Sequence, residues 1–164
     1  MTEPKTFPVR VNLPPALRVQ MVALLNQQLC DLLDLYSQIK QAHWNVKGPH
    51  FHQLHLLFDS LAEQVEGHAD TTAERAVALG GVATGTARQV AAGSRLPEYP
   101  EGVADGLALV AAVADRYAAL GTTTRAAIRT ASDAGDDGTA DLFTGLSRDL
   151  DKSTWFLEAH LQGK

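Results

Sequence analysis

The chain has 164 residues, of which 45% are hydrophobic and 20% are charged, and its formal net charge at pH 7 is −5. This length and composition fit one soluble domain with a sizeable core, and the negative charge argues against a generally basic surface for nucleic acid. No apolar run approaches the roughly 20 residues of a membrane-spanning helix, and the first residues lack the apolar segment of a secretory signal. The single Cys30 cannot form an internal disulfide, which favours a reducing, cytoplasmic location.

The first part of the chain predicts an extended arm followed by a long helix. We expect residues 1–13 to form the arm, and Pro14 and Pro15 to open the helix, because a first turn tolerates proline. This helix reaches about Val46, and Lys47-Gly48-Pro49 then ends it with two stop signals. Its apolar residues recur at helical spacing: Leu17, Met21, Leu25, Leu32, Tyr36 and Ile39.

The second helix is predicted from His52 to Leu79, where Gly80-Gly81 ends it. The short turn before it makes an αα-hairpin, in which His43, on the apolar face of the first helix, is placed to reach His55. Residues 82–101 follow as a linker that is long for a helix–helix connection and has the length of a crossover between parallel helices.

The last part of the chain predicts two more helices. The third runs from about Val103 to Thr130, with threonines weakening it locally near residues 122–124. An acidic turn follows, and Asp136 or Asp137 caps the fourth helix, which continues nearly to the end of the chain. Four helices with one long middle connection predict an all-α, ferritin-like four-helix bundle, folded as one domain.

The second helix carries a stripe of metal-ligand side chains beside its apolar seam. His55 and Asp59, and again Asp70 and Glu74, are four residues apart, and all four fall within an arc of roughly 100°. The two pairs are 15 positions apart, or roughly 22 Å along the helix axis, so one helix cannot close one metal site with all four. Two copies packed antiparallel about a point near Gln64 would form two equal intersubunit sites. The alternative is a solvated helix face with i,i+4 polar pairs.

Two segments of the chain carry recognisable motifs. The first is KQAHWNVKGPHFHQLH at residues 40–55, which is followed in the second helix by spaced Asp residues, Ala-Glu-Arg and Leu-Gly-Gly; the second is DKSTWFLEAHLQ at residues 151–162. Together these motifs resemble the Dps family, the mini-ferritins of starved cells. The resemblance covers essentially all of the chain after about residue 14. It implies a hollow shell of twelve subunits that binds Fe(II) between two-fold-related subunits. Such a shell oxidises the iron, preferably with hydrogen peroxide rather than O₂, and stores ferric mineral inside.

The resemblance also implies which residues bind iron. The family's ferroxidase ligands fall on five positions, each with the expected residue type: His43, His55, Asp59, Asp70 and Glu74. Imidazole and carboxylate groups suit Fe(II), and Zn²⁺ is expected to compete for the same ligands. Trp44 is expected near the site, where it either intercepts stray oxidant or has only a packing role. No Glu is followed three residues later by His, so the Glu-x-x-His site of ordinary ferritins is absent.

Other polar residues give weaker signals. His50 and His52 are either an auxiliary metal site or surface histidines, and His160 is expected to be structural. His68 lies about 160° from Asp70 around the helix, outside the first set of ligands. An acidic cluster follows the third helix and consists of Asp133, Asp137 and Asp141. In the family, acidic residues at this place line a three-fold pore through which Fe(II) enters. The alternative is that these carboxylates only cap the next helix and interact with solvent.

DNA binding is the family property that this sequence supports least. The N-terminal arm carries one Lys and one Arg before Val11, and the net charge of every subunit is −5, so we expect weak or absent DNA binding at neutral pH. Three functions remain open at this stage: a ferroxidase and iron store, a nucleoid-associated protein that coats DNA, and a non-catalytic metal buffer.

Overall fold

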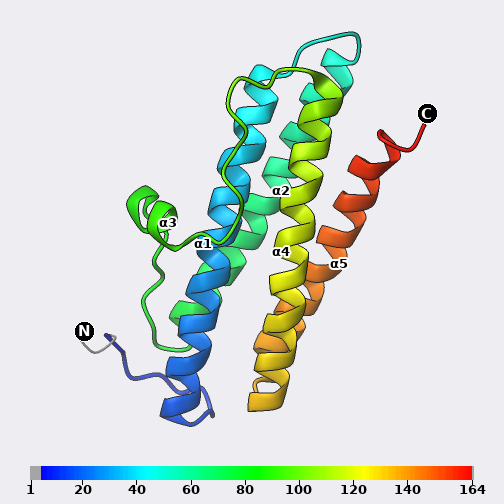
Figure 1. Cartoon of the computed structure of the whole chain (residues 1–164). Helices are drawn as coiled ribbons and strands as arrows, with labels where there is room; N and C mark the ends of the chain where they lie inside the picture. The colour runs from blue at the N-terminus through cyan, green and yellow to red at the C-terminus, as the bar shows by residue number, and fades with distance from the viewer. Residues whose placement is uncertain (1–4, 164) are drawn as a thin grey trace.

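The computed structural model describes residues 5–163, in which four long helices form a bundle and a fifth, short helix lies outside it (Figure 1). The long helices pair as two antiparallel hairpins, α1 with α2 and α4 with α5. Their bounds are α1 Pro15–Asn45, α2 Phe51–Ala78, α4 Gly106–Ala134 and α5 Asp137–Ala159, and the short helix is α3 Ala87–Gly93. The predicted all-α four-helix bundle with a long middle crossover is therefore confirmed.

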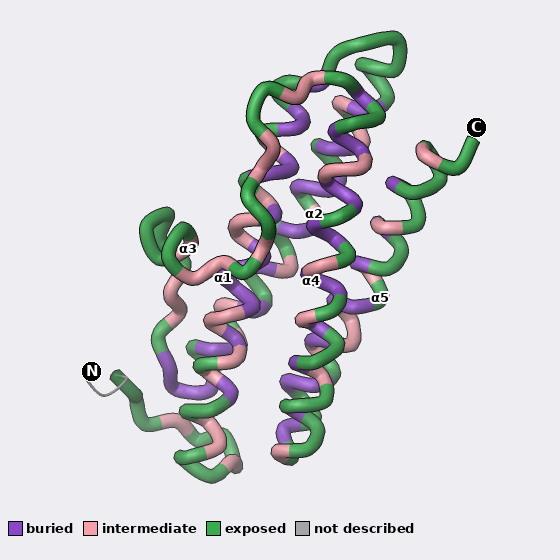
Figure 2. The backbone as a smooth tube through the Cα atoms, in the orientation of Figure 1, coloured by how far each residue is buried: buried purple, intermediate pink, exposed green. Residues whose placement is uncertain are grey.

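The described part of the expected arm, residues 5–14, contains no helix or strand, and residues 1–4 lie outside the described residues. Buried residues recur along the four long helices (Figure 2) and form one hydrophobic core. They include the periodic residues of the first helix, such as Met21, Leu25 and Leu32, and Thr72 on the apolar seam of α2. None of the described helices is long and apolar enough to span a membrane.

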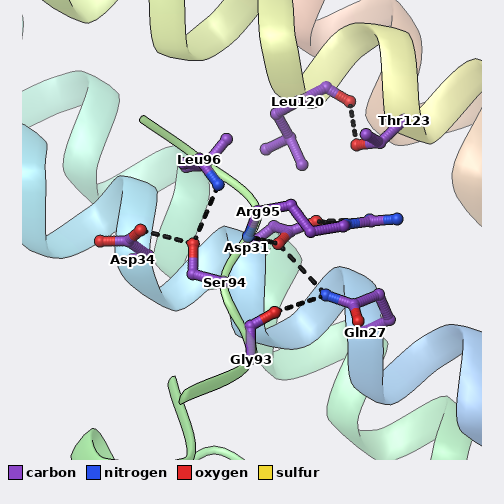
Figure 3. Close-up of polar contacts among 9 residues, drawn as sticks. All are labelled: Gln27, Asp31, Asp34, Gly93, Ser94, Arg95, Leu96, Leu120 and Thr123. Atoms are coloured by element: carbon purple, nitrogen blue, oxygen red, sulfur yellow. Dashed lines mark hydrogen bonds and ion pairs between the residues drawn. The ribbon is translucent and has the colours of Figure 1, made fainter. Parts of the chain in front are cut away.

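The crossover from α2 to α4 runs alongside α1, held there by polar contacts (Figure 3). Asp31, which is fully buried, accepts hydrogen bonds from the backbone N, Nε and Nη2 of Arg95 at 2.9, 2.9 and 2.5 Å. Ser94 Oγ donates to Asp34 Oδ2 at 2.5 Å. At the far end of α1, the backbone N of Lys47 donates to the Ala104 carbonyl at 2.9 Å. The chain thus returns along α1, so that α4 runs parallel to α2, as the linker length predicts.

The structure differs from the expected elements mainly in the crossover and at both ends of α4. The predicted linker contains α3, which begins with a capping box between Thr86 and Gln89. The helix expected to start at Val103 begins at Gly106, because Asp105 caps it by accepting from the backbone N of Ala108 at 2.9 Å. That helix continues past the predicted end at Thr130, without a break at its threonines, to Ala134.

Candidate metal centre

The loop between α1 and α2 brings two histidines together. His43 lies in the last turn of α1 and His55 in the second turn of α2. The connection between the helices, residues 46–50, is short because Gly48 adopts a φ of 110°, a conformation that glycine reaches without steric cost. The predicted approach of His43 to His55 is therefore confirmed, and their rings stack with centroids 3.7 Å apart and planes at 22°.

Each histidine ring is hydrogen-bonded to the backbone carbonyl of the other histidine. His43 Nδ1 lies 2.8 Å from the His55 carbonyl oxygen, and His55 Nδ1 lies 2.9 Å from the His43 carbonyl oxygen. A carbonyl oxygen only accepts, so Nδ1 carries the hydrogen in both rings. In the neutral imidazoles the lone pair is then on Nε2, the nitrogen left free to bind a metal ion.

A carboxylate lies near this histidine pair. Asp59 Oδ1 is 3.9 Å from His43 Nε2, and His43 itself is only 9% exposed while Asp59 is open to solvent. Lys40 Nζ donates to the same oxygen, Asp59 Oδ1, at 2.7 Å. This hydrogen bond is the main cause that lowers the pKa of Asp59 below its ordinary value. The carboxylate therefore stays charged, with a lysine ammonium beside it.

Lys40 is the residue of this cluster that the sequence analysis missed. A signal was available, because Lys40 lies three residues before His43 and so shares its side of α1. Its ammonium group is close to the position that a cation bound between His43 and Asp59 would take.

The other two predicted ligands lie further along α2 and do not join this cluster. Asp70 and Glu74 are exposed, and neither side chain forms a hydrogen bond or ion pair with another described residue. A hollow of about 270 Å³ opens beside Asp70, with small residues such as Ala73 and Gly85 on its walls. Within residues 5–163 of one chain, no three His, Cys, Asp or Glu side chains are grouped closely enough to hold a metal ion.

Trp44, expected near the site, and His50 and His52, expected in the turn before it, are all exposed. Trp44 is 67% exposed, and Phe51 and Leu56 on the first turns of α2 are exposed as well. His50 takes the N-cap position of α2 without a capping hydrogen bond from its side chain, and His52 is exposed. Among these side chains, the Phe51 ring lies beside that of His55, with centroids 5.3 Å apart.

The remaining histidines have structural partners. His68 Nε2 lies 2.9 Å from Asp149 Oδ2 and links α2 to α5, while His160 Nδ1 lies 2.7 Å from the Phe156 carbonyl oxygen within α5. The interpretation of His160 as structural and the exclusion of His68 from the ligand set agree with these contacts.

The acidic turn between α4 and α5 divides into one buried and several exposed carboxylates. Asp136 is buried, caps α5 by accepting from Thr139 N at 3.0 Å, and accepts from Arg75 Nη2 at 2.7 Å. Asp136, not Asp137, is therefore the cap. The three residues expected at a pore are all exposed: Asp133, Asp137 and Asp141.

Comparisons with known proteins agree with this fold along almost the whole chain. The ferritin-like domain model matches residues 22–163. A DNA protection during starvation protein of Agrobacterium fabrum is 42% identical over 98% of this chain and 99% of its own length. Two solved structures from Streptomyces coelicolor each give a TM-score of 0.92: DpsC, 32% identical over 98% of this chain and 94% of its own, and DpsA14, 34% identical over 99% and 96%.

Proposed function

Because this chain belongs to the Dps family of ferritin-like proteins, we propose that it is a ferroxidase and iron store whose catalytic sites lie between two subunits. Fe(II) is the substrate, hydrogen peroxide the preferred oxidant, and the ferric product is kept inside a shell of twelve chains. His43, His55 and Asp59 are proposed as ligands from one subunit, with Asp70 and Glu74 as ligands from its two-fold partner.

The reciprocal hydrogen bonds of His43 and His55 are the observation that carries this proposal. They leave both Nε2 atoms unprotonated in the neutral rings, one of them 3.9 Å from the Asp59 carboxylate. Two imidazoles and a carboxylate are a donor set that suits Fe(II) and that leaves coordination positions open for an oxidant.

The spacing along α2 supports a site shared between subunits. Asp70 and Glu74 lie roughly 22 Å along the helix axis from His55 and Asp59. Both carboxylates are exposed and have no side-chain partner among the described residues. Small residues line the surface hollows beside them. A two-fold axis through the middle of α2 would place the Asp70 end of one helix against the His55 end of the other, and would produce two identical sites.

The chemistry balances with two iron ions per peroxide. Each Fe(II) gives up one electron, the O–O bond breaks, and two added protons complete two water molecules, so no hydroxyl radical is released. Exposed carboxylates such as Asp133, Asp137 and Asp141 around a pore would raise the local concentration of Fe(II) by their charge.

The test is iron oxidation by a double variant. His43→Ala with Asp59→Asn removes ligands from one half-site, and we expect peroxide-dependent Fe(II) oxidation to slow strongly while the shell stays assembled. The matched control is His50→Ala with His52→Ala, which removes two exposed histidines from the same end of the hairpin. Oxidation at the parent rate in the first variant would show that the ligands are wrong, and slow oxidation in the second would make His50 and His52 part of the site.

The names of the relatives concern DNA protection, which coating the DNA or removing iron and peroxide would both provide. The described arm offers only Lys5 and Arg10 as cations, and the chain carries a net charge of −5. We therefore propose protection by chemistry, with weak or no DNA binding at neutral pH. A gel shift at low salt that shows tight complexes would favour the DNA-coating function instead.

A further inference from the structure

A cavity of about 180 Å³ lies between the arm, the start of α1 and the end of α2. These segments lie at the end of the α1–α2 hairpin opposite the turn that carries the histidine pair (Figure 1). Phe7 from the arm, Val19 and Val22 from α1, and Leu79 at the end of α2 supply apolar walls. The cavity is formed by one chain alone and is distant from the proposed iron ligands His43 and His55.

The Gly80-Gly81 pair, first noted as a helix stop, shapes this cavity. Gly80 has a φ of 86°, and its carbonyl accepts from the backbone N of Phe7 at 2.8 Å, which ties the arm down. A Cβ at Gly80 would lie 2.5 Å from the Phe7 carbonyl oxygen, and one at Gly81 would lie 2.4 Å from Val22 Cγ1. Only glycine lets the arm and α1 close over this space.

The described lining of the cavity carries positive charge and no acidic residue. Lys5 and Arg18 are among its lining residues, which include no Asp or Glu. Lys5 Nζ lies 5.1 Å from the centre of the Phe7 ring, and Arg18 Nη1 donates to the Leu79 carbonyl at 3.3 Å.

Arg18 also has an unused donor. Its Nε is buried and finds no acceptor among the described residues. A buried N–H without an acceptor is unfavourable, and one on a cation especially so. Because this nitrogen is closed to solvent, a ligand in the cavity would meet the guanidinium elsewhere on its surface, where a carboxylate would neutralise its charge.

We propose that this cavity binds a short aliphatic carboxylate, with the carboxylate on Arg18 and the alkyl chain among Val19, Val22 and Leu79. The cavity is smaller than the roughly 300–1,000 Å³ of sites for drug-sized ligands, so it selects a chain of a few carbons. Apolar walls beside the half-buried Arg18 match such a ligand better than a sugar, a nucleotide or a bare inorganic anion.

The experiment is calorimetric titration of the assembled full-length protein with hexanoate, and with 1-hexanol as the uncharged probe of equal chain length. We expect saturable binding of one hexanoate per chain, tighter than that of hexanol. Arg18→Met keeps the apolar stem but removes the charge, and should weaken hexanoate binding by about tenfold, as loss of a charged hydrogen bond does, while hexanol binding stays the same. Arg10→Gln is the matched control, because Arg10 is an exposed arm cation outside the cavity lining, and it should bind hexanoate like the parent.

Several results would overturn the proposal. Absence of saturable binding to the assembled protein would mean that the cavity is not a ligand site. Equal affinity for hexanoate and hexanol, or unchanged hexanoate binding in Arg18→Met, would exclude a carboxylate site. Val22→Phe fills the cavity from its wall, and parent affinity in that variant, with parent helix content by circular dichroism, would place the ligand elsewhere.

Discussion

Mixed shells made from two inactive variants give the sharpest test of a shared site. The first variant, His43→Ala with His55→Ala, lacks the histidine half-set in every chain. The second, Asp70→Asn with Glu74→Gln, lacks the carboxylate half-set in every chain. Neither variant alone has a complete site, so each should be close to inactive in peroxide-dependent Fe(II) oxidation.

The magnitude follows from the two-fold arrangement of half-sites. A site in a mixed shell is complete only where a chain with intact histidines faces a chain with intact carboxylates. In a random one-to-one mixture each condition holds for half of the chains, so about one quarter of the sites are complete. Co-expressed mixed shells should therefore regain about one quarter of the parent rate per chain.

The assay is initial-rate Fe(II) oxidation by stopped-flow absorbance, with shells checked for size beforehand. The control is the same two variants assembled separately and then combined, which should stay inactive because no chains exchange. If Asp70 and Glu74 acted with the histidines of their own chain, every chain in the mixed shell would lack part of its site. Mixed shells as inactive as the control would therefore refute the intersubunit reasoning.

Three further predictions concern charge and metal competition. Lys40→Met should raise Zn²⁺ affinity at pH 7 by about two- to fivefold, the range expected for an exposed ion pair, by titration against a metal indicator. In that variant the pKa of Asp59, followed by NMR, should rise from its lowered value toward the ordinary one. In the parent, the stability contributed by the Lys40–Asp59 pair is fully present above the pKa that Asp59 has in the unfolded chain. This stability is lost as the pH falls through the lower pKa that Asp59 has in the folded protein. Arg95→Ala should destabilise the fold by about 3 kcal/mol, measured by urea denaturation, because it removes the guanidinium partner of the fully buried Asp31 side chain. Zinc added before iron should slow Fe(II) oxidation, and a chelator that removes the zinc should restore the rate; an unchanged rate would exclude a shared ligand set.

The long helices and the His43–His55 contact were predictable because they depend on local patterns. Apolar residues at helical spacing define the buried faces of the helices. Because the turn that joins α1 and α2 is short and contains glycine, the two helices pack antiparallel. The positions of His55, Asp59, Asp70 and Glu74 on one side of α2 then follow from the fixed rotation and rise per residue of an α-helix. A cap at Asp136 or Asp137 was predictable for the same reason, since an acidic residue directly before a periodic segment is a local signal, and the structure shows that Asp136 is the cap.

The contacts that the sequence did not reveal depend on pairing between distant segments. Asp31 lies on α1 among buried residues, and only the fold shows that Arg95, 64 residues later, neutralises it. The short helix α3 had a local signal in the Thr86 and Gln89 capping box, but seven residues between glycines and prolines do not produce a clear helical period. Lys40 escaped attention because its partner Asp59 lies on the other helix of the hairpin.

The reciprocal hydrogen bonds of His43 and His55, each from a ring nitrogen to the backbone carbonyl of the other residue, affect what single substitutions at these positions can measure. Each ring is oriented by a peptide carbonyl, which every substitution at that position retains. Replacing His43 therefore deletes one metal donor but leaves the proton of His55 on Nδ1, and the reverse also holds. Single replacements at these positions should thus report the contribution of one donor at a time, without rotating its neighbour away from the ion.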